Sequence, residues 1–363
     1  MSQSTFGKKF TVTTWGESHG KALGAVVDGV PAGLFLTEAD IQAYLNRRKP
    51  GQSRYTTARN EGDEVEILSG VFEGQTTGTP ISMIVRNKDQ RSRDYGNIAQ
   101  TYRPGHADFG FDSKYGFRDY RGGGRSSGRE TIGRVAAGAI AARILKELGI
   151  TLQAYTSSIG PVSCHSYHPE IIPENSFYMP DMVAAEKATK YLEKCMKEED
   201  SAGGVVECRI SGVPAGIGDP VFGKLDAAFA QALMSIGAVK AVEIGDGVKV
   251  STMKGSENND GFHMENGRIV KTTNHSGGIL GGISDGGEIL LRAHSKPTPS
   301  ISQPQQTVTT TGENTSIEIK GRHDPVIVPR AVVVVESMAA ITLVDAMFSN
   351  MSARMDYVKN FYL

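Results

Sequence analysis

The stretch RGGGRSSGRE at residues 121–130 runs directly into TIGRVAAGAIAARILKEL at residues 131–148. The apolar residues of the second segment recur with the spacing of one helical face, and Gly149 follows as a plausible C-cap. Alanine and glycine dominate this helix around residues 133–138, so we expect close neighbours to bury it. The junction therefore predicts a buried core helix that begins at a glycine–arginine loop.

The loop at residues 121–130 has the composition of an anion-binding site. Its glycines allow backbone N–H groups to turn toward a ligand without interference from a Cβ atom. Arg121, Arg125 and Arg129 offer planar forks that suit phosphate or carboxylate. A helix that starts directly after the loop directs its positive end to the same place.

Composition limits the function classes. The chain has 363 residues, of which 39% are hydrophobic and 22% charged, so it can bury a large core as one or two domains. A formal net charge of −1 argues against a general nucleic-acid or membrane binder. Many of the arginines nevertheless fall between residues 47 and 134, which favours a small anionic ligand.

Cysteine usage and the N-terminal sequence indicate the compartment. Cys164, Cys195 and Cys208 are odd in number and lack Cys-x-x-Cys spacing, so we expect neither a disulfide framework nor a zinc site. Residues 1–10 have no apolar core of signal-peptide length, and no apolar run approaches the ~18 residues of a membrane span. We therefore expect a cytoplasmic protein.

Periodicity and capping residues predict the other elements. Thr37 and Asp40 form a capping-box variant that starts a helix with an apolar stripe. Further helices are expected at about residues 181–198, 221–235 and 331–348. Strands are expected at Val65–Leu68, Ile81–Val85, Val205–Ile210, Val239–Ile244 and Ile289–Leu291. The polar segments around 87–101, 253–262 and 297–312 are expected to be loops.

The chain contains an internal repeat. GVPAG occurs at residues 29–33 and again at 212–216, and Ser-x-Gly precedes both copies at the same offset, at 18–20 and 201–203. A weaker echo links GRSS at residue 124 to GRHD at residue 321. We expect two pseudo-equivalent halves, roughly 10–150 and 195–350, with the ligand where they meet. The alternative is chance, because Val-Pro-Ala-Gly is an ordinary turn composition.

Several loops contain candidate catalytic residues, but the segment that most resembles a P-loop does not match that motif. GESHGK at 16–21 is one residue too short for a P-loop and has Ala22 where a hydroxyl binds magnesium. His19 and His106 lie in glycine-flanked loops and are suited to proton transfer, although a loop histidine is more often merely solvated. Asp324 offers a carboxylate, but it could instead cap an element or pair with Arg322. These residues favour an enzyme for a phosphorylated, multiply anionic substrate and leave the reaction open.

Five segments, in order along nearly the whole chain, resemble the motifs of chorismate synthases. They are GESHG at 16–20, RPGHAD at 103–108, the segment at 124–131, NHSGGILGG at 274–282 and RHDP at 322–325. Any one could be accidental, but all five in sequence are very specific. The resemblance implies an α/β fold of the α+β type: one domain over 1–363, with helices layered between antiparallel sheets and an internal pseudo-two-fold repeat. It also implies a homotetramer.

The resemblance implies a reaction and three catalytic residues. The family converts 5-enolpyruvylshikimate 3-phosphate to chorismate and phosphate, a 1,4-elimination that ends the shikimate pathway and requires reduced FMN although it is redox-neutral overall. His19 would protonate the departing phosphate. His106 would stabilise the anionic reduced flavin, and Asp324 would lie near flavin N5 and help remove the ring proton by way of the flavin.

The resemblance also implies binding residues. Flavin contacts would come from Arg125, Ser126, Ser127, Gly237, Ala238, Gly281, Lys296, Pro297, Thr298, Pro299, Ser300 and Arg322. Substrate anions would be held by Arg48, Arg54, Arg103, Arg129 and Arg134. Arg48 and Arg54 could equally serve a nicotinamide nucleotide (NADP), and the residues do not separate these two assignments.

The sequence departs from the family pattern at two positions. Gly237 replaces a common asparagine and Pro299 a usual serine; both should contact flavin mainly through the backbone, so binding should survive. With no room for an added reductase, an external flavin reductase is expected to supply reduced FMN, and no metal is expected for the chemistry. The rival functions are another phosphate-handling flavoenzyme, a metal-dependent phosphotransferase, or an anion- or RNA-binding protein.

Overall fold

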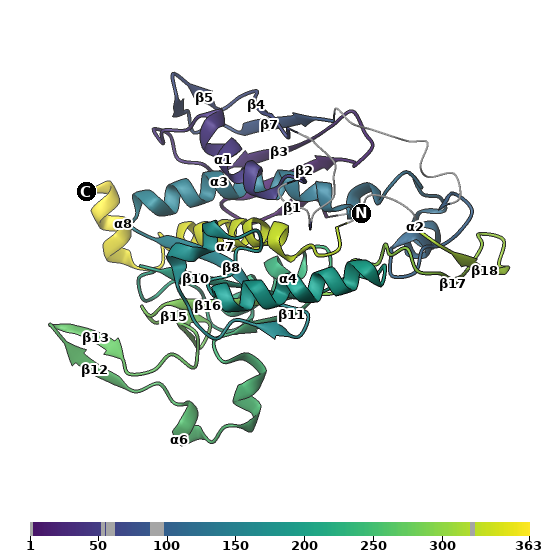
Figure 1. Cartoon of the computed structure of the whole chain (residues 1–363). Coiled ribbons are helices and arrows are strands. Elements are labelled where there is room, and N and C mark those ends of the chain that lie inside the picture. The colour runs from purple at the N-terminus through teal and green to yellow at the C-terminus, as the bar shows by residue number, and fades with distance from the viewer. Residues whose placement is uncertain (1–2, 52–54, 56–61, 88–97, 320–323) are drawn as a thin grey trace.

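The computed structural model describes residues 3–51, 55, 62–87, 98–319 and 324–363. Two five-stranded antiparallel sheets form its outer layers (Figure 1). The first sheet has the order β1 (Thr5–Phe6), β2 (Thr11–Gly16), β3 (Ala22–Asp28), β7 (Ile81–Arg86) and β4 (Val65–Ile67). The second has the order β9 (Val162–Ser163), β8 (Thr151–Ile159), β10 (Gly204–Ser211), β16 (Ile289–Ser295) and β11 (Val239–Ile244).

Helices fill the space between the two sheets (Figure 1). α3 (Thr131–Glu147) packs on the first sheet and α7 (Val328–Asn350) on the second, and the two helices pack against each other. α1 (Glu38–Arg48) lies beside α3, and α5 (Leu225–Met234) lies beside α7. The expected fold class, with helices layered between antiparallel sheets, is confirmed.

The contact between α3 and α7 explains the small residues of the alanine-rich helix. A Cβ atom on Gly138 would lie 2.2 Å from the Cβ of Ser337, so the helix axes can approach only because residue 138 is glycine. The expected burial of α3 is confirmed. No uninterrupted apolar run of ~18 residues was expected, and Glu336 interrupts that of α7; by length and average composition, however, α7 is apolar and long enough to cross a membrane. Most of α7 is buried inside the fold, as in the core helix of a soluble protein.

The two sheets repeat one topology. The strand order β2-β3-β7-β4 in the first sheet corresponds to the order β8-β10-β16-β11 in the second. The helices α1 and α3 of the first half correspond to α5 and α7 of the second. The pairing register is also the same: Leu23 and Val65 both pair with Val85, and Val206 and Val242 both pair with Ala293. The backbone therefore contains the pseudo-two-fold repeat that the sequence predicts.

The GVPAG turns show the repeat at the level of single hydrogen bonds. In the first half Thr76 Oγ1 donates to Pro31 O at 2.6 Å, and the Gly33 N–H donates to Thr76 O at 2.8 Å. In the second half Ser284 makes the same bonds, to Pro214 O at 2.6 Å and from the Gly216 N–H at 2.8 Å. The boundaries of the halves, 10–150 and 195–350, stay a prediction, and residues 321–323 of the weaker echo lie outside the described residues.

The remaining elements test the local expectations. The Thr37 capping box is present, and the predicted helices appear as α4 (Met182–Lys197), α5 and α7. The segments expected to be loops contain α6 (Gly255–Asn258), the start of β12 (Phe262–Glu265) and β17 (Gln305–Val308). β12 pairs with β13 (Arg268–Lys271) in an arm that projects from the body in Figure 1. Shorter elements are α2 (Asp108–Tyr115), α8 (Met355–Tyr362), β5 (Val71–Phe72), β6 (Gln75–Thr76), β14 (Ile279–Leu280), β15 (Ile283–Ser284) and β18 (Asn314–Ile317).

Candidate active site

A cleft of about 1220 Å³ opens where the first turns of α3 and α7 meet the loops of both halves. One wall is apolar and comes from α7, through Ile327, Ala331, Val334, Met338 and Ile341. The opposite walls are rich in cationic and hydroxyl side chains. The cleft thus combines apolar side chains with charged groups, which suits a ring that carries anionic substituents.

Most of the predicted site residues line this one cleft. They are His19, Arg48, Arg103, His106, Arg125, Ser126, Ser127, Arg129, Arg134, Gly237, Ala238, Lys296, Thr298, Pro299, Ser300 and Asp324. Gly281 lies in the turn between β14 and β15, and neither it nor Pro297 lines the cleft. Arg54 and Arg322 lie outside the described residues.

His19 lies in the loop that joins β2 to β3 and packs against the glycine–arginine loop. A Cβ atom on Gly122 would lie 2.8 Å from the imidazole, so a side chain at position 122 would displace the ring. Gly122 also has a φ of +80°, a conformation that favours glycine. The Nδ1 atom of His19 lies 3.2 Å from Ser18 Oγ. The glycine at 122 therefore determines where the imidazole lies.

His106 connects the first half to the segment at 296–300. Its Nδ1 lies 3.0 Å from Pro104 O, which can only accept, so Nδ1 carries a proton. Its Nε2 lies 3.0 Å from Ser300 Oγ, which can donate to the neutral imidazole. Next to it, Lys296 Nζ donates to Gly105 O at 2.6 Å. These contacts determine the tautomer and the direction of the ring.

Asp324 lies immediately before α7 and faces the cleft. Its carboxylate accepts from Arg330 NH1 at 2.5 Å, and Arg330 Nε donates to Arg48 O at 3.0 Å. The expected alternative partner, Arg322, lies outside the described residues. Arg330 thus ties Asp324 to the end of α1.

The arginines of the cleft are oriented by carboxylates. Buried Asp63 binds Arg48 at 2.6 Å and Arg129 at 3.2 Å. Arg103 forms a bidentate pair with Asp108, and its hydrogen bonds keep the pKa of this carboxyl below its usual value although burial raises it. These pairs fix each guanidinium fork before a ligand arrives.

Arg134 is also paired with a carboxylate, whereas Arg125 is held by backbone carbonyls. Arg125 donates to Gly16 O at 3.0 Å and to Thr14 O at 3.1 Å, so its fork anchors the glycine–arginine loop to β2. Arg134 binds Glu130 at 3.0 Å and Ser235 Oγ at 2.6 Å. The third arginine of the loop, Arg121, pairs with exposed Asp119. Of the three loop arginines, Arg125 and Arg129 line the cleft and Arg121 does not.

The walls from the second half contain strained and unsatisfied groups. Ala238 has a φ of +73°, which is uncommon for a residue with a side chain, and its carbonyl accepts from the Lys296 N–H. Thr298 Oγ1 is buried and has no hydrogen-bond partner within the described part of the chain. A buried hydroxyl at the wall of a cleft is a ready contact for a polar ligand group.

Several residues of the site were not singled out from the sequence. Asp63 and Asn87 contact Arg129, and Arg330 contacts the Arg48 carbonyl; each of these pairings joins positions far apart in the chain. Asp108 lies in the quoted RPGHAD segment, yet its role as the partner of Arg103 becomes visible only in the fold. No local pattern in the chain marks these partners.

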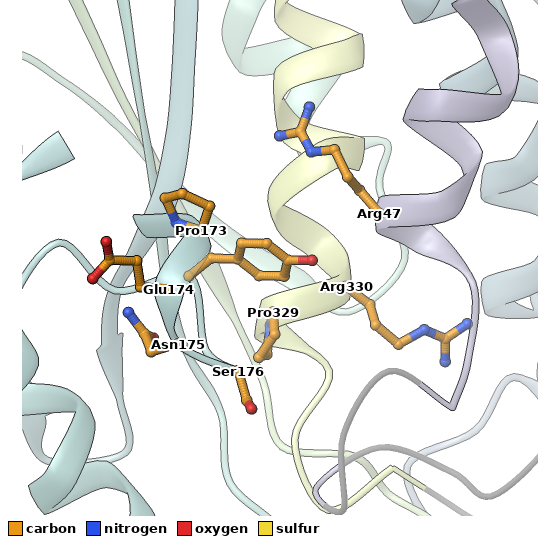
Figure 2. Close-up of a pocket in the computed structure, with 8 residues that line it drawn as sticks. Arg47, Pro173, Glu174, Asn175, Ser176, Pro329 and Arg330 are labelled. Carbon is orange, nitrogen blue, oxygen red and sulfur yellow. The ribbon is translucent and has the colours of Figure 1, made fainter. Parts of the chain in front are cut away.

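A second, smaller pocket lies on the far side of Arg330. It has a volume of about 240 Å³ and is lined by residues that include Arg47, Asn175 and Tyr178. Figure 2 shows the Arg330 side chain extending away from Asn175. Arg47 there binds buried Glu336 through both guanidinium nitrogens, at 2.7 and 2.9 Å. Arg330 lines both cavities, whereas Asn175 lines only the smaller one.

Comparison with known proteins identifies the family. The family model "Chorismate synthase" matches residues 10–348. The chain belongs to the chorismate synthase family. Chorismate synthase of Lachnoclostridium phytofermentans is 64% identical over the full length of both chains. That of Methanocella arvoryzae is 57% identical and covers 96% of this chain and 95% of its own.

A solved structure agrees with the fold. A crystal structure of chorismate synthase superposes with a TM-score of 0.77 at 32% identity, covering 98% of this chain and 97% of the other. The chain is accordingly a lyase that acts in the last step of the shikimate pathway. The recognition made from the five motifs is confirmed.

Proposed function

We propose that the chain converts 5-enolpyruvylshikimate 3-phosphate to chorismate and phosphate in the described cleft, with reduced FMN as cofactor. The observation that carries the proposal is the convergence of His19, His106 and Asp324 with the paired arginines around one cavity. The substrate has two carboxylates and one phosphate, and the arginines supply matching positive charge.

The cleft fits a flavin on two observations. Five apolar residues from α7 and the position before it line the cleft, and buried Thr298 Oγ1 has no partner in the described chain. The residues that would hold the cofactor are Arg125–Ser127, Gly237–Ala238 and Lys296–Ser300. Reduced FMN, when bound, supplies electron density that eases cleavage of the allylic C–O bond and is recovered at the end.

The chain's own residues bind and orient the substrate and transfer protons. His19 donates a proton to the oxygen of the departing phosphate, where negative charge develops. Asp324 provides the carboxylate that accepts a proton, and Arg330 keeps this carboxylate directed at the cleft. His106 presents Nε2 beside Ser300 as the polar group next to the cofactor. The arginines fix the substrate ring in the reactive orientation.

Other features of the family belong to the same proposal. A nicotinamide nucleotide is the alternative ligand of Arg48, and a separate reductase supplies the reduced flavin. The chain works as a homotetramer in the cytoplasm. Sedimentation analysis tests the tetramer, and a mass corresponding to a single chain would contradict it.

One assay tests the function. The protein is incubated without oxygen with 5-enolpyruvylshikimate 3-phosphate and chemically reduced FMN, and chorismate formation is followed by its absorbance. We expect product with reduced FMN, none with oxidised FMN, and no loss of rate with a chelator. Folded protein that gives no chorismate under these conditions would contradict the proposal. A rate abolished by chelation would favour the metal-dependent alternative.

A further inference from the structure

Asn87 follows β7 and lies directly against the His19 loop. Its side-chain Nδ2 lies within hydrogen-bond distance of three carbonyl oxygens, those of Glu17, Ser18 and Gly20, and the closest is Gly20 O at 2.7 Å. Its backbone N–H donates to Lys21 O at 3.1 Å. One residue therefore bonds to both ends of the loop that carries His19.

The other end of the Asn87 amide binds an arginine of the cleft. Its Oδ1 accepts from Arg129 NH2 at 2.6 Å, while Arg129 NH1 binds buried Asp63 at 3.2 Å. Arg129 lines the cleft, whereas Asn87 and Asp63 lie behind it. Asn87 thus connects the backbone of the His19 loop to a guanidinium group that faces the ligand.

The chemistry of this position requires an amide. Backbone carbonyls only accept and a guanidinium only donates, so the bridging side chain needs a donor at one end and an acceptor at the other. Asparagine supplies both in one rigid planar group. Aspartate would still accept from Arg129 but would direct a negative oxygen toward three carbonyl oxygens.

We propose that Asn87 is a positioning residue that holds the His19 loop in register with Arg129. The inference rests on the proposed function, because it takes His19 as the proton donor and Arg129 as a substrate ligand. When Arg129 binds an anion, Asn87 keeps the imidazole at a fixed distance from that anion. A displacement of about 1 Å at a reacting group costs on the order of 10²-fold in rate.

The variant N87D separates the two ends of the bridge. We expect kcat to fall on the order of 10²-fold while KM for 5-enolpyruvylshikimate 3-phosphate changes by less than about 3-fold, because the bond to Arg129 is kept. Hydrogen exchange of residues 15–22 should become faster in N87D without any ligand. N87A, which loses both bonds, should raise KM as well.

A matched control is available at Asn175. Its Nδ2 also donates to two backbone carbonyls, that of Ile171 in a short 3-10 helix at 3.0 Å and that of Met179 at 2.8 Å, but Asn175 does not line the active-site cleft. N175D should lower the thermal midpoint and leave kcat unchanged. Thermal unfolding of each variant identifies any that fails to fold.

Two results would overturn the inference. One is a folded N87D protein with wild-type kcat, and the other is a loss of kcat without faster exchange in residues 15–22. Failure of the proposed function is a separate outcome, because wild-type protein would then form no chorismate. Faster loop exchange in N87D would in that case still support the structural role of Asn87.

Discussion

β7 runs into Asn87, whereas its counterpart β16 ends on Ser295 at the equivalent register position. In the first half this end of the strand supports the His19 loop. In the second half the chain continues from Ser295 into Lys296–Ser300, of which all residues but Pro297 line the cleft. One scaffold position therefore supports the proposed proton donor in one half and the proposed cofactor segment in the other.

The loops that enter the sheets differ in the same way. His19 lies in a short connection between β2 and β3, whereas Ser201 and Ala202 reach β10 after the long insertion that contains α4. Ser201 Oγ donates to Thr298 O at 2.7 Å, and the Ala202 N–H donates to Pro325 O at 2.9 Å. The backbone fold repeats, but the side chains at this position have different tasks. The first copy presents His19 to the cleft, whereas the second copy holds the backbone of the segments around Thr298 and Pro325.

The largest effect on turnover is expected from a substitution of His106, where the two halves meet. In H106A the contact to Ser300 is lost, and we expect kcat to fall by about 10²-fold or more with little change in substrate affinity. Rapid kinetics and calorimetric titration of the substrate measure the two quantities. H294A is the control, because His294 bonds to Glu243 outside the cleft. Wild-type turnover in H106A would remove His106 from the mechanism.

A smaller effect, on stability, is expected where the central helices meet. G138A would place a Cβ atom 2.2 Å from that of Ser337, so we expect a loss of about 1–3 kcal/mol in the free energy of unfolding. A Cβ atom on Gly110 in α2 would meet nothing within 4 Å beyond its own helix backbone, and the φ of Gly110 is not positive, so G110A should be neutral or slightly stabilising. Denaturant unfolding compares the two. Equal stability of both variants would contradict the close helix contact.

Equivalent hydrogen bonds in the two halves allow a direct test of the repeat. T76V and S284A each remove the hydroxyl that bonds to the proline carbonyl of a GVPAG turn. We expect each to cost about 1–3 kcal/mol of unfolding free energy, by similar amounts, since each also leaves an N–H unpaired. The double variant should be additive, because the sites lie in separate turns. A cost confined to one half would show that the halves are not mechanically equivalent.

The sequence predicted those parts that depend on local pattern. Helical periodicity located α3 and α7, and Thr37 marked the start of α1. β2 and β8 were missed, because TVTTWG and TLQAYTSSI contain threonine and serine where a clear apolar alternation would be needed. β3 was missed as well, although its sequence ALGAVVD contains neither residue. Two expected loops likewise contain short hairpin strands that form by pairing rather than by pattern.

The sequence predicted those site residues that stand in recognisable motifs. His19, His106 and Asp324 stand in quoted motifs and line one cleft, while their roles stay predictions. Asp63, Asn87 and Arg330 carry no motif of their own; they matter because folding places them against residues 66, 42 and 282 positions away along the chain. Such pairings follow from sheet register and helix packing, which no single segment encodes.

The smallest change in unfolding free energy is expected in α4, in the insertion that distinguishes the second half, and its pH dependence can be tested. Asp181 caps α4 and accepts from the N–H groups of Ala184 at 3.0 Å and His165 at 2.9 Å. Burial alone would raise the pKa of this carboxyl, but the backbone donors outweigh it and lower the pKa to about 2. D181N should therefore cost about 1–2 kcal/mol of unfolding free energy at neutral pH.

The sign of the pH dependence follows from the lowered pKa. The charged Asp181 stabilises the folded chain fully above its unfolded pKa of 3.8, and this contribution is lost as the pH falls toward about 2. The difference between wild type and D181N in urea unfolding should thus be constant from pH 7 to 5 and shrink between pH 4 and 2. D226N removes a carboxylate from α5, the helix that does have a counterpart in the first half, and serves as the control. A difference that persists unchanged at pH 2 would mean that α4 is held by packing rather than by the charge of its cap.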